Sequence, residues 1–82
     1  MSSTFTLYST SWCGYCARLK TGLAQAGIDY HEVDIDLDEQ AAVRVMQANG
    51  GNQTVPTLEF SDGSTLTNPS VPQVQDKLAA LV

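Results

Sequence analysis

The stretch Trp12-Cys13-Gly14-Tyr15-Cys16 decides the fold of this chain. It holds the only two cysteines, and it lies between the strand-like run Phe5-Thr6-Leu7-Tyr8 and a helical pattern. Cysteines with this spacing, at the point where a strand leads into a helix, place both sulfurs at the helix N-terminus. Free backbone N–H groups and the helix dipole favour a thiolate there. We therefore expect Cys13 to react as a thiolate near neutral pH, which is the chemistry of thiol–disulfide exchange.

The length and charge of the chain narrow its class. Its 82 residues suit a single domain, 1–82, and its nine acidic and four basic side chains give a net charge of −5. This acidic balance argues against nucleic acid or an anionic membrane as a partner. No segment resembles a signal peptide or a membrane span, so we expect a cytoplasmic protein. In a reducing cytosol such a cysteine pair is typically catalytic or metal-binding rather than a structural disulfide.

The first part of the chain predicts a parallel unit of strand, helix and strand. Residues 4–9 read as a strand, and residues 14–26 carry an apolar stripe at helical spacing. Gly27 is placed to close this helix, and residues 30–35 alternate like a second strand. Two strands joined by one helix favour a right-handed parallel crossover.

The middle of the chain predicts a second helix followed by a hairpin. Residues 36–39 read as an acidic helix start, and Asn49-Gly50-Gly51 ends that helix. Short strands at 57–60 and 64–66 flank the turn Ser61-Asp62-Gly63. Antiparallel pairing is therefore expected to follow the parallel unit.

The last segment predicts a helix over 70–81, with Ser70 as its N-cap and Pro72 in its first turn. The complete order is strand, helix, strand, helix, strand, strand, helix. We therefore predict an α/β fold in which three helices flank a four-stranded mixed sheet.

Three signatures carry a resemblance to a known family. They are Tyr8-Ser9-Thr10-Ser11-Trp12-Cys13-Gly14-Tyr15-Cys16, Gly50-Gly51-Asn52-Gln53-Thr54-Val55-Pro56-Thr57 and Asp62-Gly63-Ser64-Thr65-Leu66-Thr67-Asn68-Pro69-Ser70. Over essentially its full length the chain resembles the glutaredoxins of the thioredoxin superfamily, and among them the actinobacterial mycoredoxins. The resemblance implies a thioredoxin/glutaredoxin fold in which a cis proline lies opposite the cysteine pair.

The resemblance assigns that proline to Pro56, preceded by Thr54 and Val55. A cis bond would aim the backbone of Val55 at a bound thiol, where its N–H and C=O groups pair with the peptide-like part of a substrate. The alternative is an ordinary trans proline at the start of an edge strand.

The position of each sulfur predicts its role. Cys13 lies at the helix entrance and is expected to be the exposed nucleophile, whereas Cys16 lies one turn inward and is expected to be more buried. The resemblance implies that Cys13 attacks the small-thiol sulfur of a protein mixed disulfide, and that a second small thiol regenerates it. Cys16 can instead close an internal disulfide, as a resolving residue or in a side branch. The sequence leaves the balance of these two routes open.

Two departures from common glutaredoxins indicate which small thiol is used. Glutaredoxins that use glutathione usually carry a lysine at the position of Thr10 and an aspartate within the segment that corresponds to Leu66-Thr67-Asn68-Pro69-Ser70. Hydroxyl and amide groups in place of charges suit a neutral, sugar-rich thiol such as mycothiol, an acetyl-cysteine joined to glucosamine and inositol. Thr67, Asn68 and Ser70 are then candidate hydrogen-bonding residues. Alternatively, this segment only turns the chain and caps the last helix.

Other residues near the cysteines have both a site interpretation and a structural one. Trp12 is expected to form an apolar lip for a partner, or else to pack at the strand end, and Tyr15 is expected to flank the bound thiol. Arg18 and Lys20 either stabilise a negative charge or lie on a solvated helix face. His31 is expected to be structural or on the surface. The predicted thiol-binding residues are Trp12, Gly14, Tyr15, Thr54, Val55, Pro56, Thr67, Asn68 and Ser70.

The predicted function is the reduction of protein–mycothiol mixed disulfides by a monomer with no bound cofactor or metal. Mycothiol is the co-substrate, mycothiolated proteins are the targets, and an NADPH-dependent reductase regenerates mycothiol. The alternatives are a glutathione-dependent glutaredoxin, or an electron donor to which thioredoxin reductase passes electrons directly. A different class is a glutaredoxin that binds an iron–sulfur cluster, which the small residue Gly14 would permit. Two cysteines and one remote histidine do not supply a closed zinc site.

Overall fold

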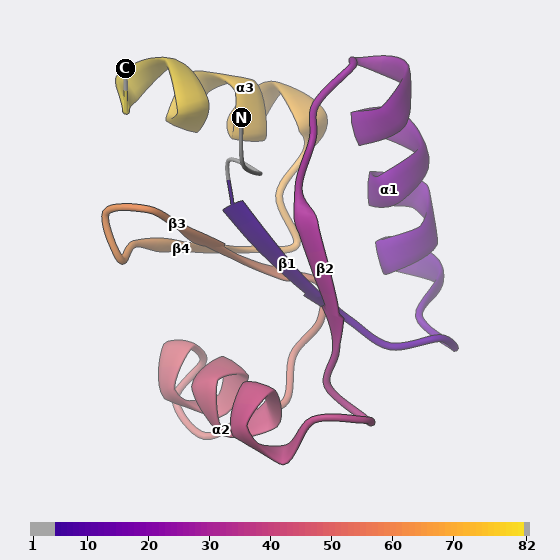
Figure 1. The fold of residues 1–82 in the computed structure, drawn as a ribbon, viewed down its shortest axis with the longest axis vertical. Helices are drawn as coiled ribbons and strands as arrows, with labels where there is room; N and C mark the ends of the chain where they lie inside the picture. The colour runs from indigo at the N-terminus through magenta and orange to yellow at the C-terminus, as the bar shows by residue number, and fades with distance from the viewer. Residues whose placement is uncertain (1–4, 82) are drawn as a thin grey trace.

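A four-stranded mixed sheet with three helices forms the fold in a computed structural model that describes residues 5–81 (Figure 1). The elements are β1 (Phe5–Ser9), α1 (Gly14–Gln25), β2 (His31–Asp34), α2 (Glu39–Ala48), β3 (Thr57–Phe60), β4 (Thr65–Thr67) and α3 (Val71–Ala80). The strand order is β2-β1-β3-β4, with β1 and β2 parallel and the other neighbours antiparallel. The predicted fold and element order are therefore confirmed.

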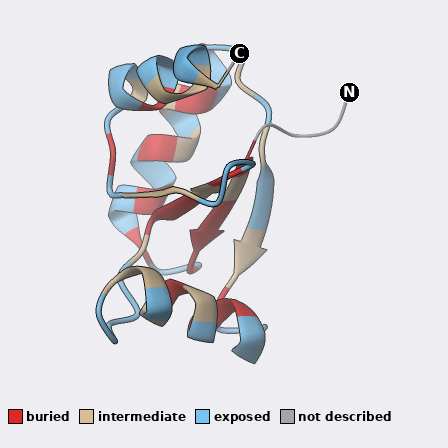
Figure 2. Cartoon of the chain, turned by 90° about the vertical axis from the view of Figure 1, so that its left-hand side faces the viewer, coloured by how far each residue is buried: buried red, intermediate tan, exposed pale blue. Residues whose placement is uncertain are grey.

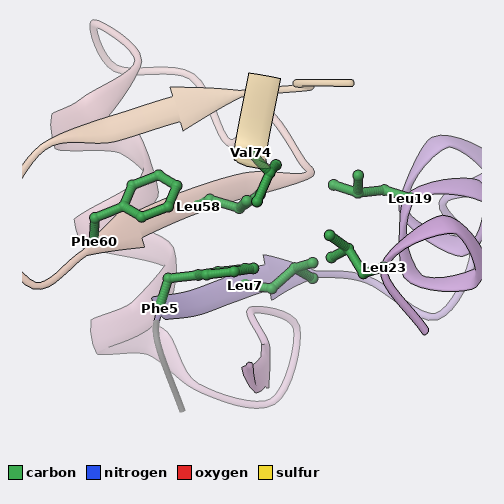
Figure 3. Close-up of a cluster of buried hydrophobic side chains, with 7 residues drawn as sticks. All are labelled: Phe5, Leu7, Leu19, Leu23, Leu58, Phe60 and Val74. Atoms are coloured by element: carbon green, nitrogen blue, oxygen red, sulfur yellow. The ribbon is translucent and has the colours of Figure 1, made fainter. Parts of the chain in front are cut away.

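The sheet separates two apolar cores because successive strand residues point to opposite faces. Leu7 points to the face that α1 and α3 cover, and Tyr8 points to the face that α2 covers. The first core contains the side chains shown in Figure 3: Phe5, Leu7, Leu19, Leu23, Leu58, Phe60 and Val74. The second core contains Tyr8, Ile35, Ala41, Ala42 and Val45. The central strands β1 and β3 are mostly buried, whereas β2 at the sheet edge is not (Figure 2).

Helix α1 begins and ends where the sequence predicts, to within one residue. Its N-cap is Cys13 and its C-cap is Ala26. Gly27 follows with a φ of +71°, a conformation that glycine adopts without steric cost. The N–H of Gly27 donates to Ala24 O at 3.1 Å and the N–H of Ile28 donates to Leu23 O at 3.0 Å. These bonds satisfy carbonyl groups that the end of the helix would otherwise leave unpaired.

Short side-chain hydrogen bonds shift the bounds of two predicted elements. The predicted helix start at 36–39 is wrong by a few residues, because Asp34 Oδ1 accepts the N–H of Asp36 at 2.9 Å and holds a turn there. Helix α2 begins after Asp38, whose carboxylate caps the N–H of Ala41 at 3.1 Å. Likewise Ser64 belongs to the hairpin turn and not to β4, because its N–H and hydroxyl both donate to Asp62.

Of the remaining elements, β2 and α3 are each shorter than predicted by one residue at both ends, β4 ends one residue later, and β3 has its predicted bounds. Strand β2 spans 31–34 within the predicted 30–35, and the predicted residues 4–9 contain β1, with Thr4 outside the described residues. Helix α3 follows Ser70, its predicted N-cap, and has a proline in its first turn. No helix within residues 5–81 is long and apolar enough to span a lipid bilayer.

The parallel pairing of β1 and β2 positions the functional site. Ser9 and Asp34, near the ends of the two strands, are paired in register. The N–H of Ile35 donates to Ser9 O at 3.0 Å just beyond the ladder. The loop that carries the cysteines and the loop that leads into α2 therefore leave the sheet at the same edge (Figure 1).

Candidate active site

The two cysteines have different hydrogen bonds at the start of α1. Cys13 is the N-cap, and its Sγ accepts the backbone N–H of Cys16 at 3.1 Å. Both thiols are free of a disulfide. The Cys13 sulfur therefore lies at the helix N-terminus, where unpaired backbone N–H groups and the positive end of the helix dipole meet. Cys13 is the cysteine at the entrance of α1, whereas Cys16 lies within the first turn of the helix.

Cys13 is less accessible than the sequence predicts. Only 8% of its surface is exposed, so its description as an exposed nucleophile is wrong, whereas the deeper burial of Cys16, at 0%, is confirmed. Part of the reason is the loop of Val55 and Pro56, because Cys13 Sγ lies 3.8 Å from Val55 O. A partner thiol must therefore approach through the small open part of the Cys13 surface.

Cys16 is held in its protonated form. Burial raises the pKa of its thiol to about 12, with smaller contributions from the hydrogen bond and charge of Cys13. A backbone hydrogen bond from Thr10 acts in the opposite direction and is outweighed. Because only the thiolate attacks disulfides, Cys16 is a poor nucleophile near neutral pH.

The loop opposite the cysteines has the conformation that the resemblance implied. The Val55–Pro56 peptide bond is cis, so the trans alternative is wrong. The carbonyl of Val55 faces Cys13, and Pro56 is buried beneath it. The site is therefore assembled from two distant parts of the chain, the start of α1 and the segment before β3.

A polar network that the sequence analysis missed supports this loop. The hydroxyl of Thr57, which is 1% exposed, donates to Thr54 O at 2.8 Å. Asn49, the C-cap of α2, donates from Nδ2 to Thr57 Oγ1 at 3.0 Å and to Val45 O at 2.9 Å. The sequence contained two signals of this network, an asparagine at the end of α2 and a threonine directly after the proline. These bonds tie the loop to α2.

The segment 67–70, which the sequence predicts to bind the sugar part of the thiol, lies beside the Val55–Pro56 loop. Most of its polar groups are hydrogen-bonded within the protein. Thr67 Oγ1 donates to Asn49 Oδ1 at 2.6 Å. Ser70 Oγ accepts the N–H of Gln73, whose side chain returns to the Ser70 N–H, so the capping alternative holds for Ser70. Asn68 adopts a φ of +48° and its N–H donates to Pro56 O at 2.8 Å. Its side-chain amide has no hydrogen-bond partner among residues 5–81, so it is the most available of the three.

A groove of about 730 Å³ runs from Tyr15 along α1 to the start of α3. Its lining residues are Tyr15, Arg18, Leu19, Thr21, Gly22, Gln25, Asn68, Pro69, Ser70, Val71 and Pro72. Arg18 lies in this groove and forms no ion pair with any described carboxylate, whereas Lys20 pairs with Glu32 at 2.8 Å. Arg18 therefore presents its charge to the groove, whereas the charge of Lys20 is paired with Glu32 on the edge strand β2.

Comparison with known proteins identifies the family. The glutaredoxin family model matches residues 5–65. The chain belongs to the glutaredoxin family. A Mycobacterium tuberculosis protein that is provisionally named a glutaredoxin is 54% identical over 81 residues, covering 99% of this chain and 96% of its own length. Mycoredoxin 1 of Corynebacterium glutamicum is 44% identical over 79 residues, covering 96% and 98%.

Solved glutaredoxins share the fold of this family member. The crystal structure of a glutaredoxin from Methanosarcina mazei gives a TM-score of 0.78 at 22% identity, covering 93% of this chain and 78% of that one. A glutaredoxin from Archaeoglobus fulgidus gives 0.74 at 19% identity, covering 90% and 84%. The solved structures thus share its fold, and the family model and mycoredoxin 1 identify it as a glutaredoxin-like redox protein.

In this glutaredoxin several of the sequence-predicted residues lie on the surface around the nucleophile. Trp12 is 73% exposed and its Nε1 donates to Asp36 Oδ2 at 3.0 Å, so its interpretation as strand-end packing is wrong. Tyr15, at 63%, and Gly14 are also exposed. His31 lies exposed on β2, as expected of a surface histidine.

Thr10 does not offer its hydroxyl at the surface. The residue is 3% exposed, and its Oγ1 is the one buried side-chain polar atom without a hydrogen-bond partner in the described part of the chain. Its carbonyl accepts the N–H of Cys13 at 3.3 Å, which shapes the turn into α1. Among residues 5–81, no group of three or more His, Cys, Asp and Glu side chains is arranged to hold a metal ion.

Proposed function

We propose that this glutaredoxin reduces mixed disulfides between proteins and mycothiol through a monothiol cycle at Cys13. The proposed chemistry is supported by the hydrogen bond that one thiol accepts and by the raised pKa of the other. Cys13 Sγ accepts a backbone N–H at 3.1 Å, whereas burial raises the pKa of Cys16 to about 12. One thiol is thus prepared to attack, and the other retains its proton.

The cycle consists of two thiol–disulfide exchanges. The Cys13 thiolate attacks the mycothiol sulfur, the bond between the mycothiol and target sulfurs breaks, and the target leaves as a thiolate that takes up a proton. A mycothiol thiolate then attacks the mycothiol sulfur on Cys13 and releases the Cys13 thiolate. The product is mycothiol disulfide, which an NADPH-dependent reductase returns to two thiols.

The loop before β3 orients the substrate in this proposal. The backbone of Val55 lies against Cys13, so it can pair with the amide groups on both sides of the mycothiol sulfur, as an added strand would. Asn68 offers an unused amide nearby. We propose that the protein acts as a monomer in a reducing compartment such as the cytoplasm, where thiol buffers keep both cysteines reduced.

The choice of mycothiol is supported by two observations. Mycoredoxin 1 is similar over nearly the full length of both proteins. The segment 66–70 carries no charge that would recognise the charged ends of glutathione.

The test compares one peptide mixed disulfide in two forms, mycothiolated and glutathionylated, each with its own thiol and NADPH-dependent reductase. We expect kcat/KM for the mycothiol form to be higher by at least about tenfold, which corresponds to ~1.4 kcal/mol of transition-state discrimination. Cys13→Ser should abolish turnover, whereas Cys16→Ser should retain most of it. A preference for glutathione would refute the choice of thiol, and equal loss in both variants would refute the monothiol cycle.

A further inference from the structure

One side of the active site carries an unusual combination of exposed apolar and acidic groups. We call it the acidic lip and define it by the residues Trp12, Asp34, Asp36, Leu37, Asp38 and Glu39. Trp12 is 73% exposed and Leu37 is 85% exposed. The hydrogen bond from Trp12 Nε1 to Asp36 Oδ2 joins the two halves of the lip. One half is Trp12 in the loop after β1, and the other runs from the last residue of β2, Asp34, to the first residue of α2, Glu39.

The charges of the lip are not neutralised within the described chain. The three ion pairs among residues 5–81 use other carboxylates, those of Glu32, Glu59 and Asp62. None of the four lip carboxylates pairs with a lysine or arginine of residues 5–81. They lie within six consecutive positions of a chain whose net charge is already −5. The lip is therefore a concentrated region of negative potential.

The exposed apolar side chains of the lip, Trp12 and Leu37, are arranged as a contact site for a protein. Tryptophan is among the residues that most often dominate the energy of protein interfaces. The bond to Asp36 fixes the indole of Trp12 before any partner arrives, which reduces the entropy lost on binding. Leu37 follows Asp36 directly and adds a second exposed apolar side chain.

The lip adjoins the nucleophile. Trp12 precedes Cys13, and the two loops of the lip leave the same edge of the sheet because β1 and β2 are parallel. On another side of Cys13 lies the groove, where Arg18 is the one Lys or Arg side chain without an ion-pair partner among the described residues. The two sides of the site thus differ in charge.

We propose that the acidic lip docks the protein half of the mixed disulfide and selects target cysteines that have basic neighbours. This inference rests on the proposed function, and it identifies the protein partner by the basic residues beside its cysteine. Opposite charges accelerate association and set orientation. Lysine or arginine beside a thiol also lowers its pKa, which makes it a better leaving group in the first exchange. Docking and chemistry would therefore favour the same targets.

The test uses two peptides that differ only in the residues flanking a mycothiolated cysteine, lysines in one and glutamates in the other. At low ionic strength we expect kcat/KM to be higher for the lysine peptide by about tenfold, and added salt should reduce the difference. The triple variant Asp34→Asn/Asp36→Asn/Glu39→Gln retains the hydrogen-bond acceptors of the lip and should lose most of this preference. Leu37→Ser should lower kcat/KM for both peptides.

Single variants provide a matched control for charge. Glu39→Gln and Asp76→Asn each remove one exposed carboxylate, but Asp76 lies on α3 outside the lip. Only Glu39→Gln should weaken the preference for the lysine peptide. Equal effects of the two variants would show that net charge, and not the lip, is responsible.

Binding is measured separately with peptides that carry serine in place of the modified cysteine. Trp12 is the only tryptophan, so its fluorescence reports contact at the lip itself. We expect the lysine peptide to change this fluorescence at lower concentration than the glutamate peptide. Equal binding and equal turnover of the two peptides would overturn the docking inference and leave the proposed function intact. Failure to turn over either peptide, with charge-selective binding, would instead overturn the proposed function.

Discussion

The raised pKa of Cys16 predicts how slowly the internal disulfide closes. For a thiol with the ordinary pKa of 9.0, about 1% is thiolate near pH 7. At a pKa of about 12 the thiolate fraction is lower by about a thousandfold. Burial is the largest cause, and it persists after Cys13 has entered a mixed disulfide, whereas the hydrogen bond and the charge of Cys13 are then lost. Closure should therefore remain slower than for an ordinary thiol.

The assay loads Cys13 with a small thiol, removes the excess, and follows release of that thiol as Cys16 attacks. The closure rate should rise about tenfold for each pH unit up to about pH 10, because the thiolate fraction rises in that proportion below the pKa. Cys16→Ser should show no release and should keep most of its turnover with added thiol. A closure rate that levels off near pH 9 would refute the reasoning, because Cys16 would then titrate like an unburied thiol with a pKa of 9.0.

Two further predictions concern the site loop and the hairpin turn. Thr57→Val removes the hydroxyl that joins Asn49 to Thr54 O. The free energy of unfolding measured by chemical denaturation should fall by about 1–3 kcal/mol and kcat/KM should fall with it, whereas Thr57→Ser should restore both. Hydrogen bonds from Ser64 lower the pKa of Asp62 from 3.8 to about 2, so this carboxylate stabilises the folded state above pH 3.8 and the stabilisation is lost as the pH falls through 2. Asp62→Asn should flatten the pH dependence of the free energy of unfolding over that range, and an unchanged slope in urea titrations would contradict this assignment.

The fold was predictable because its determinants are local. Strand β3 was predicted with its observed bounds of 57–60, since a proline precedes it and a glycine turn follows it. Errors occurred where one side chain competes for a neighbouring backbone group, as Asp34 does with the N–H of Asp36. Periodicity does not report such bonds.

The site was only partly predictable because half of it depends on contacts between distant residues. The cysteine spacing and Pro56 were readable as motifs, and the structure brings them together at 3.8 Å between Cys13 Sγ and Val55 O. The cover over Cys13 and the bond from Trp12 to Asp36 arise from pairing of strands far apart in sequence. The sequence predicted that β1 and β2 pair in parallel. That prediction implies that the loops after these two strands lie close together.

The central place of β1 has a consequence for how the protein is made. Strand β1 leaves the ribosome before β2 and β3, yet it pairs with β2 on one side and with β3 on the other. The two cysteines likewise leave the ribosome on a chain whose Val55 loop is not yet in place. The site around Cys13 should therefore be complete only after the Val55 loop and β3 have left the ribosome.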